Sequence, residues 1–401
     1  MRVSTAQFYF QNSQQIGSLQ SEVNEQIKYI SSQKRVLTAK DDAVAYGTMA
    51  GYKDELNNIE KYQRNLIQAE NRNSLQEVSF NSAEDIMQEL KQTFIQANNG
   101  TLNDSDLDAL AELAKNAQEQ LLDIANTKDE TGGYVFAGFQ TQIKPFNMQS
   151  DNSVVYQGDS GVRELQVGKN VMVATNQSGD DAFENVSNLL GDFSASYQMN
   201  SSGVSVNSAV IADPSNYDVM NTPPGYNFKF TSATDLTVTD GNGITVFSTS
   251  SYTAGQDIAF NGVKVQLSGN PLPDDEFTLT PEENISVFDT VKDAINWMEL
   301  GTSTSNSPQH SVDYSEILGQ LEQALNHMTA RRVDAGVRLS LIDVQTSNHA
   351  DSSLNVQSGL SNIEDLDFAK AVSSFEQSQL SLQAAQQTFV QIKNLSLFNY
   401  L

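Results

Sequence analysis

The chain has 401 residues, contains no cysteine and carries a formal net charge of −27 at pH 7. The lack of cysteine excludes disulfide and thiol chemistry, and the acidic excess argues against nucleic acid and anionic membranes as partners. Apolar residues form 38% of the chain, enough for real cores in two or three domains. Neither a run of eighteen apolar residues nor the apolar segment of a signal peptide is visible, so we expect no membrane insertion and no cleaved signal.

The first forty residues show apolar side chains at steps of seven, which is typical of a coiled-coil helix. The positions of this stripe are Tyr9, Ile16, Leu19, Val23, Ile30 and Leu37. A polar stretch at 31–42 then breaks or bends the helix, and Asp41 or Asp42 is suited to cap the helix that follows.

A second stripe with the same spacing runs from Tyr52 to Phe94, with Asn73 as its one polar position. It predicts a long helix that ends at the Asn98-Asn-Gly100 turn, because Gly or Asn suits the left-handed position after a helix. Another helix is predicted from Asp104 to Asn126, where carboxylates at the start favour a helix N-terminus.

After residue 126 the pattern changes to short β-prone runs separated by Gly, Asp and Asn. The first runs are 134–138, 154–156 and 171–173, and a short helix is predicted near 182–190. From 191 to 285 the predicted strands are 226–231, 236–239, 244–248, 262–267 and 276–280. Asp240-Gly-Asn-Gly243 predicts a hairpin turn between two of them. This segment is therefore expected to be an all-β insertion with its own small core.

Helical spacing returns at 287–300 and, after a polar loop, in a third long stripe from Leu321 to Ile363. The last stripe lies between Glu364 and the C-terminus. Its bulky positions recur at steps of seven, and mostly small residues follow three positions after each. The bulky residues are Phe368, Phe375, Leu382 and Phe389, the residues after them are Ala371, Ser378, Ala385 and Ile392, and the chain ends with Leu397, Phe398 and Leu401. A helix with such a stripe needs a partner, and the N-terminal stripe is the predicted one. We expect the two ends to close on each other and to stack against copies of the chain.

The helices are nested about the β-rich centre, which predicts an α+β fold in three parts. These are a terminal coiled-coil domain (1–42 and 364–401), a helical core domain with β-hairpins (43–190 and 286–363) and an exposed β domain (191–285).

No pattern in the sequence predicts a catalytic, cofactor or metal site. His310, His327 and His349 are isolated and lack further ligands at metal-binding spacing. The acidic run at 104–108 lacks the Gly and Glu of a calcium loop. Nucleotide-binding and nucleophile motifs are also missing. We therefore expect a protein that is not an enzyme and binds no cofactor.

Several blocks of the sequence resemble the flagellin superfamily. The segment 31–44 is similar to the signature after that family's first helix, with Lys34, Arg35, Asp41 and Asp42 in place. Gln33 stands at a usual Gly and Ala43 at a usual Pro. The blocks 1–5, 126–138, 156–159 and 333–339 are similar to further family segments, and 252–277 resembles a β-module of hook-associated proteins. The ending 395–401 resembles the hook-filament junction branch of the family rather than filament flagellins.

The resemblance implies a flagellin-like, long antiparallel coiled-coil bundle of N- and C-terminal segments with a β-rich central insertion. The terminal helices would form an inner tube wall, the middle helices an outer wall and the insertion an exposed knob. It implies an extracellular structural adaptor of the flagellum, assembled as a ring of copies between the preceding hook-associated protein and flagellin. Export would use the flagellar type III apparatus, with a cytoplasmic export chaperone holding the chain beforehand.

Two other functions stay open, and a third is disfavoured. A filament flagellin would share every physical feature except the C-terminal ending. An extracellular adhesin would use the β insertion for binding, and predicts a secretion signal and an anchor. A filament-borne enzyme would need clustered titratable groups in the insertion, where the acidic residues are instead spread through turns.

Overall fold

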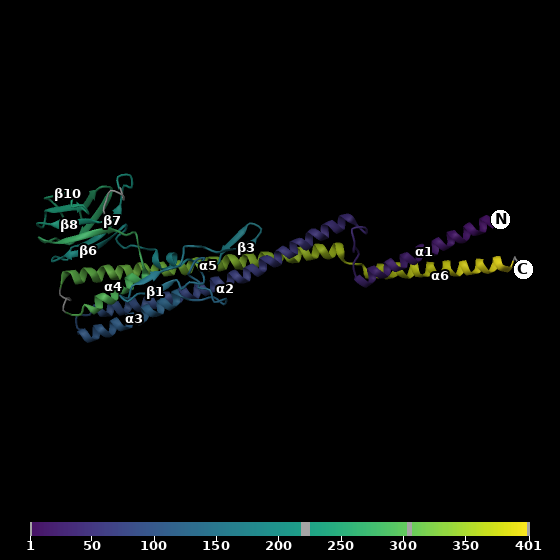
Figure 1. The fold of residues 1–401 in the computed structure, drawn as a ribbon, viewed down its shortest axis with the longest axis horizontal. Helices are drawn as coiled ribbons and strands as arrows, with labels where there is room; N and C mark the ends of the chain where they lie inside the picture. The colour runs from purple at the N-terminus through teal and green to yellow at the C-terminus, as the bar shows by residue number, and fades with distance from the viewer. Residues whose placement is uncertain (1, 218–224, 303–306, 399–401) are drawn as a thin grey trace. The chain divides into compact units, whose positions relative to one another are not determined.

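The computed structural model describes residues 2–217, 225–302 and 307–398, and within these ranges the side chains from 7 to 391 (Figure 1). The chain forms two compact units. Unit 1 comprises residues 1–64 and 344–401, and unit 2 comprises residues 65–343. The long helices α2 (Ala43–Ala97) and α5 (Pro308–Glu364) contain residues of both units, so each unit is described by itself.

Unit 1 contains the two terminal helices, α1 (Arg2–Ser32) and α6 (Phe368–Phe398), which lie side by side (Figure 1). Helix α1 ends where Gln33 adopts a positive φ of 58°. Helix α2 begins beyond Asp42, whose Oδ1 accepts a hydrogen bond of 2.9 Å from the backbone N–H of Ala45. The predicted break after the first helix and its capping by an aspartate are both present.

The last helix begins later than Glu364, where the sequence pattern places its start. Helix α5 ends at Glu364 and α6 begins at Phe368. Between them the backbone N–H of Leu366 donates to the carbonyl of Gln33 over 3.1 Å, which takes the chain out of the helical path. Asp367 then caps α6, because its Oδ1 accepts from the N–H of Lys370 over 3.1 Å.

The helical part of unit 2 consists of α3 (Asp104–Ala125), α4 (Val287–Glu299) and the unit 2 portions of α2 and α5. Helix α3 starts with a capping box in which Asn103 and Asp106 satisfy each other's backbone N–H groups. The core is rich in aromatic side chains that are fully buried. These are Phe80, Phe94, Phe136, Phe146, Phe183 and Phe288.

The polar position in the stripe of α2 has a structural role. Asn73 is fully buried, and its Nδ2 donates to the carbonyls of Ala69 and Ala174 over 2.8 and 3.0 Å. Its Oδ1 accepts from Arg338 of α5 over 3.3 Å. Because all its hydrogen-bonding groups have partners, the buried amide is tolerated and ties α2 to α5 within unit 2.

Short two-stranded sheets belong to the same unit as these helices. They pair β1 (Phe146–Met148) with β2 (Val154–Tyr156), β3 (Glu164–Gly168) with β4 (Val171–Ala174), and β5 (Val186–Ser187) with β14 (Asn284–Ile285).

Two local predictions in this region are wrong. The run 134–138 forms turns with a single bridge from Tyr134 to Lys128, because the N–H groups of Tyr134 and Val135 bond to residues on different segments. The helix expected near 182–190 is a π-helical turn at Asp180–Glu184. It stops because Asn188 bonds to Glu282 and Glu283 and draws the chain into a β-ladder.

The β insertion forms two sheets around one core. The strands are β6 (Phe193–Met199), β7 (Ser205–Ile211), β8 (Tyr226–Phe230), β9 (Leu236–Asp240), β10 (Thr245–Thr249), β11 (Asp257–Phe260), β12 (Val263–Ser268) and β13 (Glu276–Pro281). One sheet has the order β10-β9-β8-β13-β6 and the other the order β11-β12-β7, with neighbouring strands antiparallel.

All five strands predicted in the insertion are present, shifted by at most one residue at an end. The sequence pattern missed β6, β7 and β11. Four of the seven residues in each of β6 and β7 are Ser, Ala, Asn or Gln, so their apolar signal is weak, and β11 is only four residues long.

Candidate functional site

The predicted assembly surface is the pair of helices α1 and α6 in unit 1. Val23 and Leu382 are the best-buried members of the two stripes, each 7% exposed. The half-buried members are Tyr9, Ile16, Leu19, Ile30, Leu37, Phe375 and Phe389. The rings of Tyr9 and Phe389 meet edge-on with centroids 5.8 Å apart. The two stripes therefore face each other, as the sequence predicted.

Small residues let the two helices approach closely. Ala371 and Ser378, three residues after Phe368 and Phe375, are 5% and 8% exposed. The hydroxyl of Ser378 donates to the carboxylate of Glu22 on α1 over 3.0 Å. Bulky residues at one position and small residues three later thus build a tight seam.

Other large apolar side chains of the pair are exposed in the single chain. Phe368, a predicted seam residue, is 55% exposed. The further exposed members are Phe8, Phe10, Ile27, Leu380 and Val390. These exposed apolar side chains are spread along both helices and leave apolar area open to further contacts. Among the remaining predicted residues, the side chains of Ile392, Leu397 and Phe398 and the whole of Leu401 lie outside the described part of the structure.

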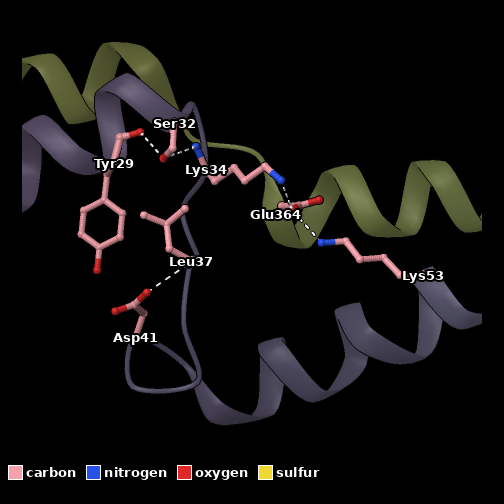
Figure 2. A network of polar contacts seen from close by, with 7 residues as sticks. All are labelled: Tyr29, Ser32, Lys34, Leu37, Asp41, Lys53 and Glu364. Carbon is pink, nitrogen blue, oxygen red and sulfur yellow. Dashed lines mark hydrogen bonds and ion pairs between the residues drawn. The ribbon is translucent and has the colours of Figure 1, made fainter.

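The family-signature residues Lys34, Arg35, Asp41 and Asp42 lie in the loop between α1 and α2, and Figure 2 shows Lys34 and Asp41 among them. The carboxylate of Glu364 receives the ammonium groups of Lys34 and Lys53 at 2.6 and 2.9 Å. Burial alone would raise the pKa of Glu364, whose side chain is 10% exposed, but the hydrogen bonds and charges of both lysines hold it below its ordinary value. The ion pairs thus join the loop, α2 and the end of α5.

The same loop is bonded to the α5–α6 connection through its backbone. The N–H of Arg35 donates to the carbonyl of Glu364 over 2.7 Å, beside the Leu366–Gln33 bond described above. The Arg35 guanidinium donates to the carbonyl of Ile363 over 2.9 and 3.2 Å. Arg35 therefore satisfies carbonyls at the C-terminus of α5, where a cation is favoured by the helix dipole.

Asp41 shapes the loop from within. Its Oδ2 accepts from the backbone N–H of Leu37 over 3.0 Å (Figure 2) and from that of Thr38 over 2.8 Å. These bonds hold the pKa of Asp41 below the ordinary value. Burial and the neighbouring Asp41 raise the pKa of Tyr29 to about 12. Asp41 therefore acts as a turn residue, while Asp42 is the helix cap.

Sequence reasoning missed Val36. This side chain is 2% exposed and packs with Ala45 and Met49 of α2 against Leu360 and Ile363 of α5. The seven-residue spacing selected its neighbour Leu37, which is half-buried. The spacing cannot be carried through the loop because the helix has already ended, so no sequence signal marks Val36.

The histidines have structural partners in the part of the chain that the structure describes. His310 stacks on Trp297, His349 stacks on Tyr62, and the Nε2 of His327 lies 2.9 Å from the carbonyl of Asp181. Within the described ranges, no three His, Asp or Glu side chains are grouped so that they could hold a metal ion. Each described helix is also too short or too polar to cross a membrane.

Comparison with known proteins decides the family. The models of the bacterial flagellin N-terminal and C-terminal helical regions match residues 3–141 and 318–401. The chain belongs to the flagellin family. These two matches include the terminal helices and the signature loop of unit 1.

Individual flagellin-family relatives cover nearly the whole chain. Flagellar hook-associated protein 3 of Escherichia coli is 24% identical over 398 residues, which are 99% of each chain. Flagellin A of Vibrio cholerae is 23% identical over 393 residues, covering 93% of this chain and 92% of its own. The solved structure of the flagellar junction protein FlgL from Legionella pneumophila is 28% identical, with a TM-score of 0.65, and covers 80% of this chain and 100% of its own.

Proposed function

We propose that this protein is a structural adaptor of the bacterial flagellum that joins the hook to the flagellin filament. The observation that carries the proposal is the likeness to hook-associated protein 3 over 99% of both chains, insertion included. The likeness in fold and sequence to a flagellar junction protein supports it, and so does the C-terminal ending at 395–401.

The assembly interface of this adaptor consists of the stripe residues of α1 and α6. The seam residues hold the two helices together, and the exposed apolar side chains around Phe368 and Leu380 pack on neighbouring copies in a ring. Lys34, Arg35, Asp41 and Asp42 fix the loop that sets the direction of these helices.

The partners in this proposal follow from the place of the adaptor. One side of the ring meets the preceding hook-associated protein and the other meets flagellin. An export chaperone holds the chain in the cytoplasm, and the flagellar type III apparatus exports it without cleavage of a signal peptide. The protein has no catalytic role. The terminal coiled coil, helical core and β insertion (191–285) act as inner wall, outer wall and exposed knob.

Deletion of the gene tests the adaptor function. We expect cells with complete hooks that shed flagellin into the medium, because the first flagellin subunits have no platform. Motility and attached filaments should return when the full chain is supplied from a plasmid. Normal filaments in the deletion strain would contradict the proposal.

Filament flagellin is the second candidate, favoured by the likeness to Vibrio flagellins over more than nine-tenths of both chains. The same deletion separates the two functions. Loss of the major filament subunit would leave hooks without filaments and no flagellin antigen in the medium. Shed flagellin in the medium is expected only when the missing protein is the adaptor.

A further inference from the structure

The β insertion has a hydrophobic core of its own within unit 2. This core runs from Leu190 to Leu279, and none of its buried members belongs to the aromatic core of the helices. At its base, the insertion is joined to the preceding segment by Asn188, whose backbone N–H donates to the carbonyl of Glu283 and whose Nδ2 donates to the carbonyl of Glu282. The N–H of Glu282 donates in turn to the carbonyl of Asp192 within the insertion. Since the two cores are separate, the remaining contacts decide how firmly the insertion is docked.

In the part of the chain that the structure describes, one side-chain hydrogen bond links the insertion to α5 beyond this base. The hydroxyl of Tyr197 on β6 donates to Oε1 of Glu316 over 2.7 Å. The same hydroxyl accepts from the N–H of Val206 on β7 over 3.0 Å, which fixes its position. Figure 1 shows β6 lying beside α5.

Two cavities flank this contact. One of about 570 Å³ lies between the β6–β7 turn and the first turns of α5, and includes Gly203, Asn207 and Ser311 in its lining. The other, of about 270 Å³, lies between β6, α4 and α5 and includes Ala195 and Gln320. Glu316 lines both. The contact therefore lies between two hollows, and beyond it the insertion approaches α5 closely where Gly203 meets Pro308.

The charges around Glu316 are all acidic. Asp313 lies one turn earlier on α5, and Asp293 faces the smaller cavity from α4. Tyr197 is the titratable group from β6, and no Lys, Arg or His is among the described residues that line either cavity. Lys292, next to Asp293, is paired with Asp151 at 3.1 Å. The half-buried Glu316 thus has no cation to balance its charge.

We infer that the Glu316–Tyr197 contact is a pH-dependent latch, which docks the β insertion on α5 while Glu316 is neutral and releases it when Glu316 is ionised. Burial, joined by the charge of Asp313, raises the pKa of Glu316 to about 7, against the smaller opposite effect of the Tyr197 hydrogen bond. In the undocked state this carboxyl is in water and has its ordinary pKa.

The sign of the pH dependence follows from the difference between the pKa of Glu316 in the docked state and in the undocked state. Docking is strongest below the ordinary pKa of a glutamate and is lost as the pH rises through about 7, because ionised Glu316 prefers water. With allowance for solvent around the half-buried carboxyl, the docking constant should fall roughly ten- to a hundredfold between pH 5 and pH 9.

The chain has no cysteine, so two spin labels can be placed without background. Labels on Asn242→Cys in the insertion and Ser340→Cys on α5 report the distance between them by pulsed dipolar spectroscopy. We expect a narrow distribution of distances at pH 5, and at pH 9 a broader distribution with a longer mean distance. An unchanged distribution in the wild-type background would overturn the latch.

Variants separate the latch from general effects of pH. Glu316→Gln should keep the narrow distribution at both pH values, and Tyr197→Phe should give the broad one at both. Glu322→Gln, a matched change on the exposed face of α5, should respond like the wild type. A Glu316→Gln chain that still broadens at pH 9 would rule out the latch. If this variant fails to fold by circular dichroism, Asp313→Asn replaces it, and an unchanged transition midpoint would count against the inference.

Discussion

Unit 1 and the helical core of unit 2 both have helices with apolar residues at steps of seven, but these residues are buried to different extents. In unit 2, Phe80, Met87 and Phe94 of α2 are completely buried, because α3, α4 and the connecting segments cover them. In unit 1, α1 and α6 have mainly each other, and most of their stripe residues stay half-buried. The core of unit 2 is therefore complete within one chain, whereas the stripes of the terminal pair stay partly exposed in it.

The largest effect is expected from an aromatic residue of unit 2. Phe183 is fully buried, and its ring contacts Phe80, Phe136, Phe146 and Phe288. Phe183→Ala should lower the free energy of unfolding by about 3–5 kcal/mol, measured by chemical denaturation of the monomer.

Phe139→Ala is the matched control for this change, since its side chain is 65% exposed. It should change the free energy of unfolding by less than about 0.5 kcal/mol. Equal stability of the two variants would contradict the close packing of Phe183 in the unit 2 core.

Two leucines of α6 allow a buried and an exposed position of the terminal pair to be compared. Leu382 is 7% exposed and Leu380 is 66% exposed. Leu382→Ala should weaken the pairing of α1 and α6 by about 2–3 kcal/mol, near the lower end for buried leucines, because the seam is small. Hydrogen exchange of both helices in the monomer measures this loss, while the unfolding of unit 2 should stay unchanged.

Leu380→Ala should leave the exchange rates of the monomer as they are and reduce the retention of filaments on cells. If both variants exchange like the wild type, the terminal helices are unpaired in the monomer and the contrast between the units is even greater. Faster exchange in Leu380→Ala alone would contradict the assigned seam.

A smaller effect is expected at Glu364, which joins the signature loop to α5. Glu364→Gln removes the charge that Lys34 and Lys53 share and should cost about 1 kcal/mol, since both lysine side chains are nearly half exposed to solvent. The amides of Arg35 and Leu366 should then exchange faster with solvent. Glu376→Gln on the exposed side of α6 should have no such effect.

The pH dependence of this contact has a defined sign. The pKa of Glu364 is lowered in the folded chain, so its contribution is present above the ordinary pKa of a glutamate and is lost as the pH falls through the lowered value. Protection of the two amides that persists unchanged into strong acid would show that the ion pairs contribute nothing.

The smallest effect concerns Gln33, which stands at a usual glycine and has a φ of 58°. Gln33→Gly should stabilise unit 1 by about 0.5–1 kcal/mol, because glycine adopts this conformation without a steric penalty. The same substitution at Gln20, within α1, should destabilise it by about 1 kcal/mol. Both are measured by hydrogen exchange of α1, and two changes of the same sign would contradict the left-handed turn.

The sequence predicted the helices because their apolar spacing persists over many turns. Stripes such as Tyr52–Phe94 and Leu321–Ile342 are long enough that one polar position does not hide the period. The short strands β6, β7 and β11 carry little periodic signal, and their pairing is decided by partners distant in sequence. The π-helical turn at Asp180–Glu184 likewise depends on a distant partner, since Asn188 is held by residues near 282.

The candidate site was predictable where it follows the helical period. Val23, Leu382 and the Tyr9–Phe389 contact follow directly from the seven-residue steps. Phe368 follows the same steps but lies in the first turn of α6, where it is exposed. The ion pairs of Glu364 join residues more than 300 positions apart, so neither their existence nor their geometry can be read from local sequence.

The bond between Arg35 and Glu364 also limits when the terminal unit can be built. Lys34 and its partner Glu364 are 330 positions apart in the chain, and α1 packs on a helix that begins only at Phe368. A polypeptide that emerges from a ribosome or a narrow channel one end first cannot close this loop before nearly its entire length is free. Unit 2 can fold earlier, because all its residues precede position 344. The pair of terminal helices, which carries the proposed assembly interface, is therefore the last part of the chain that can form.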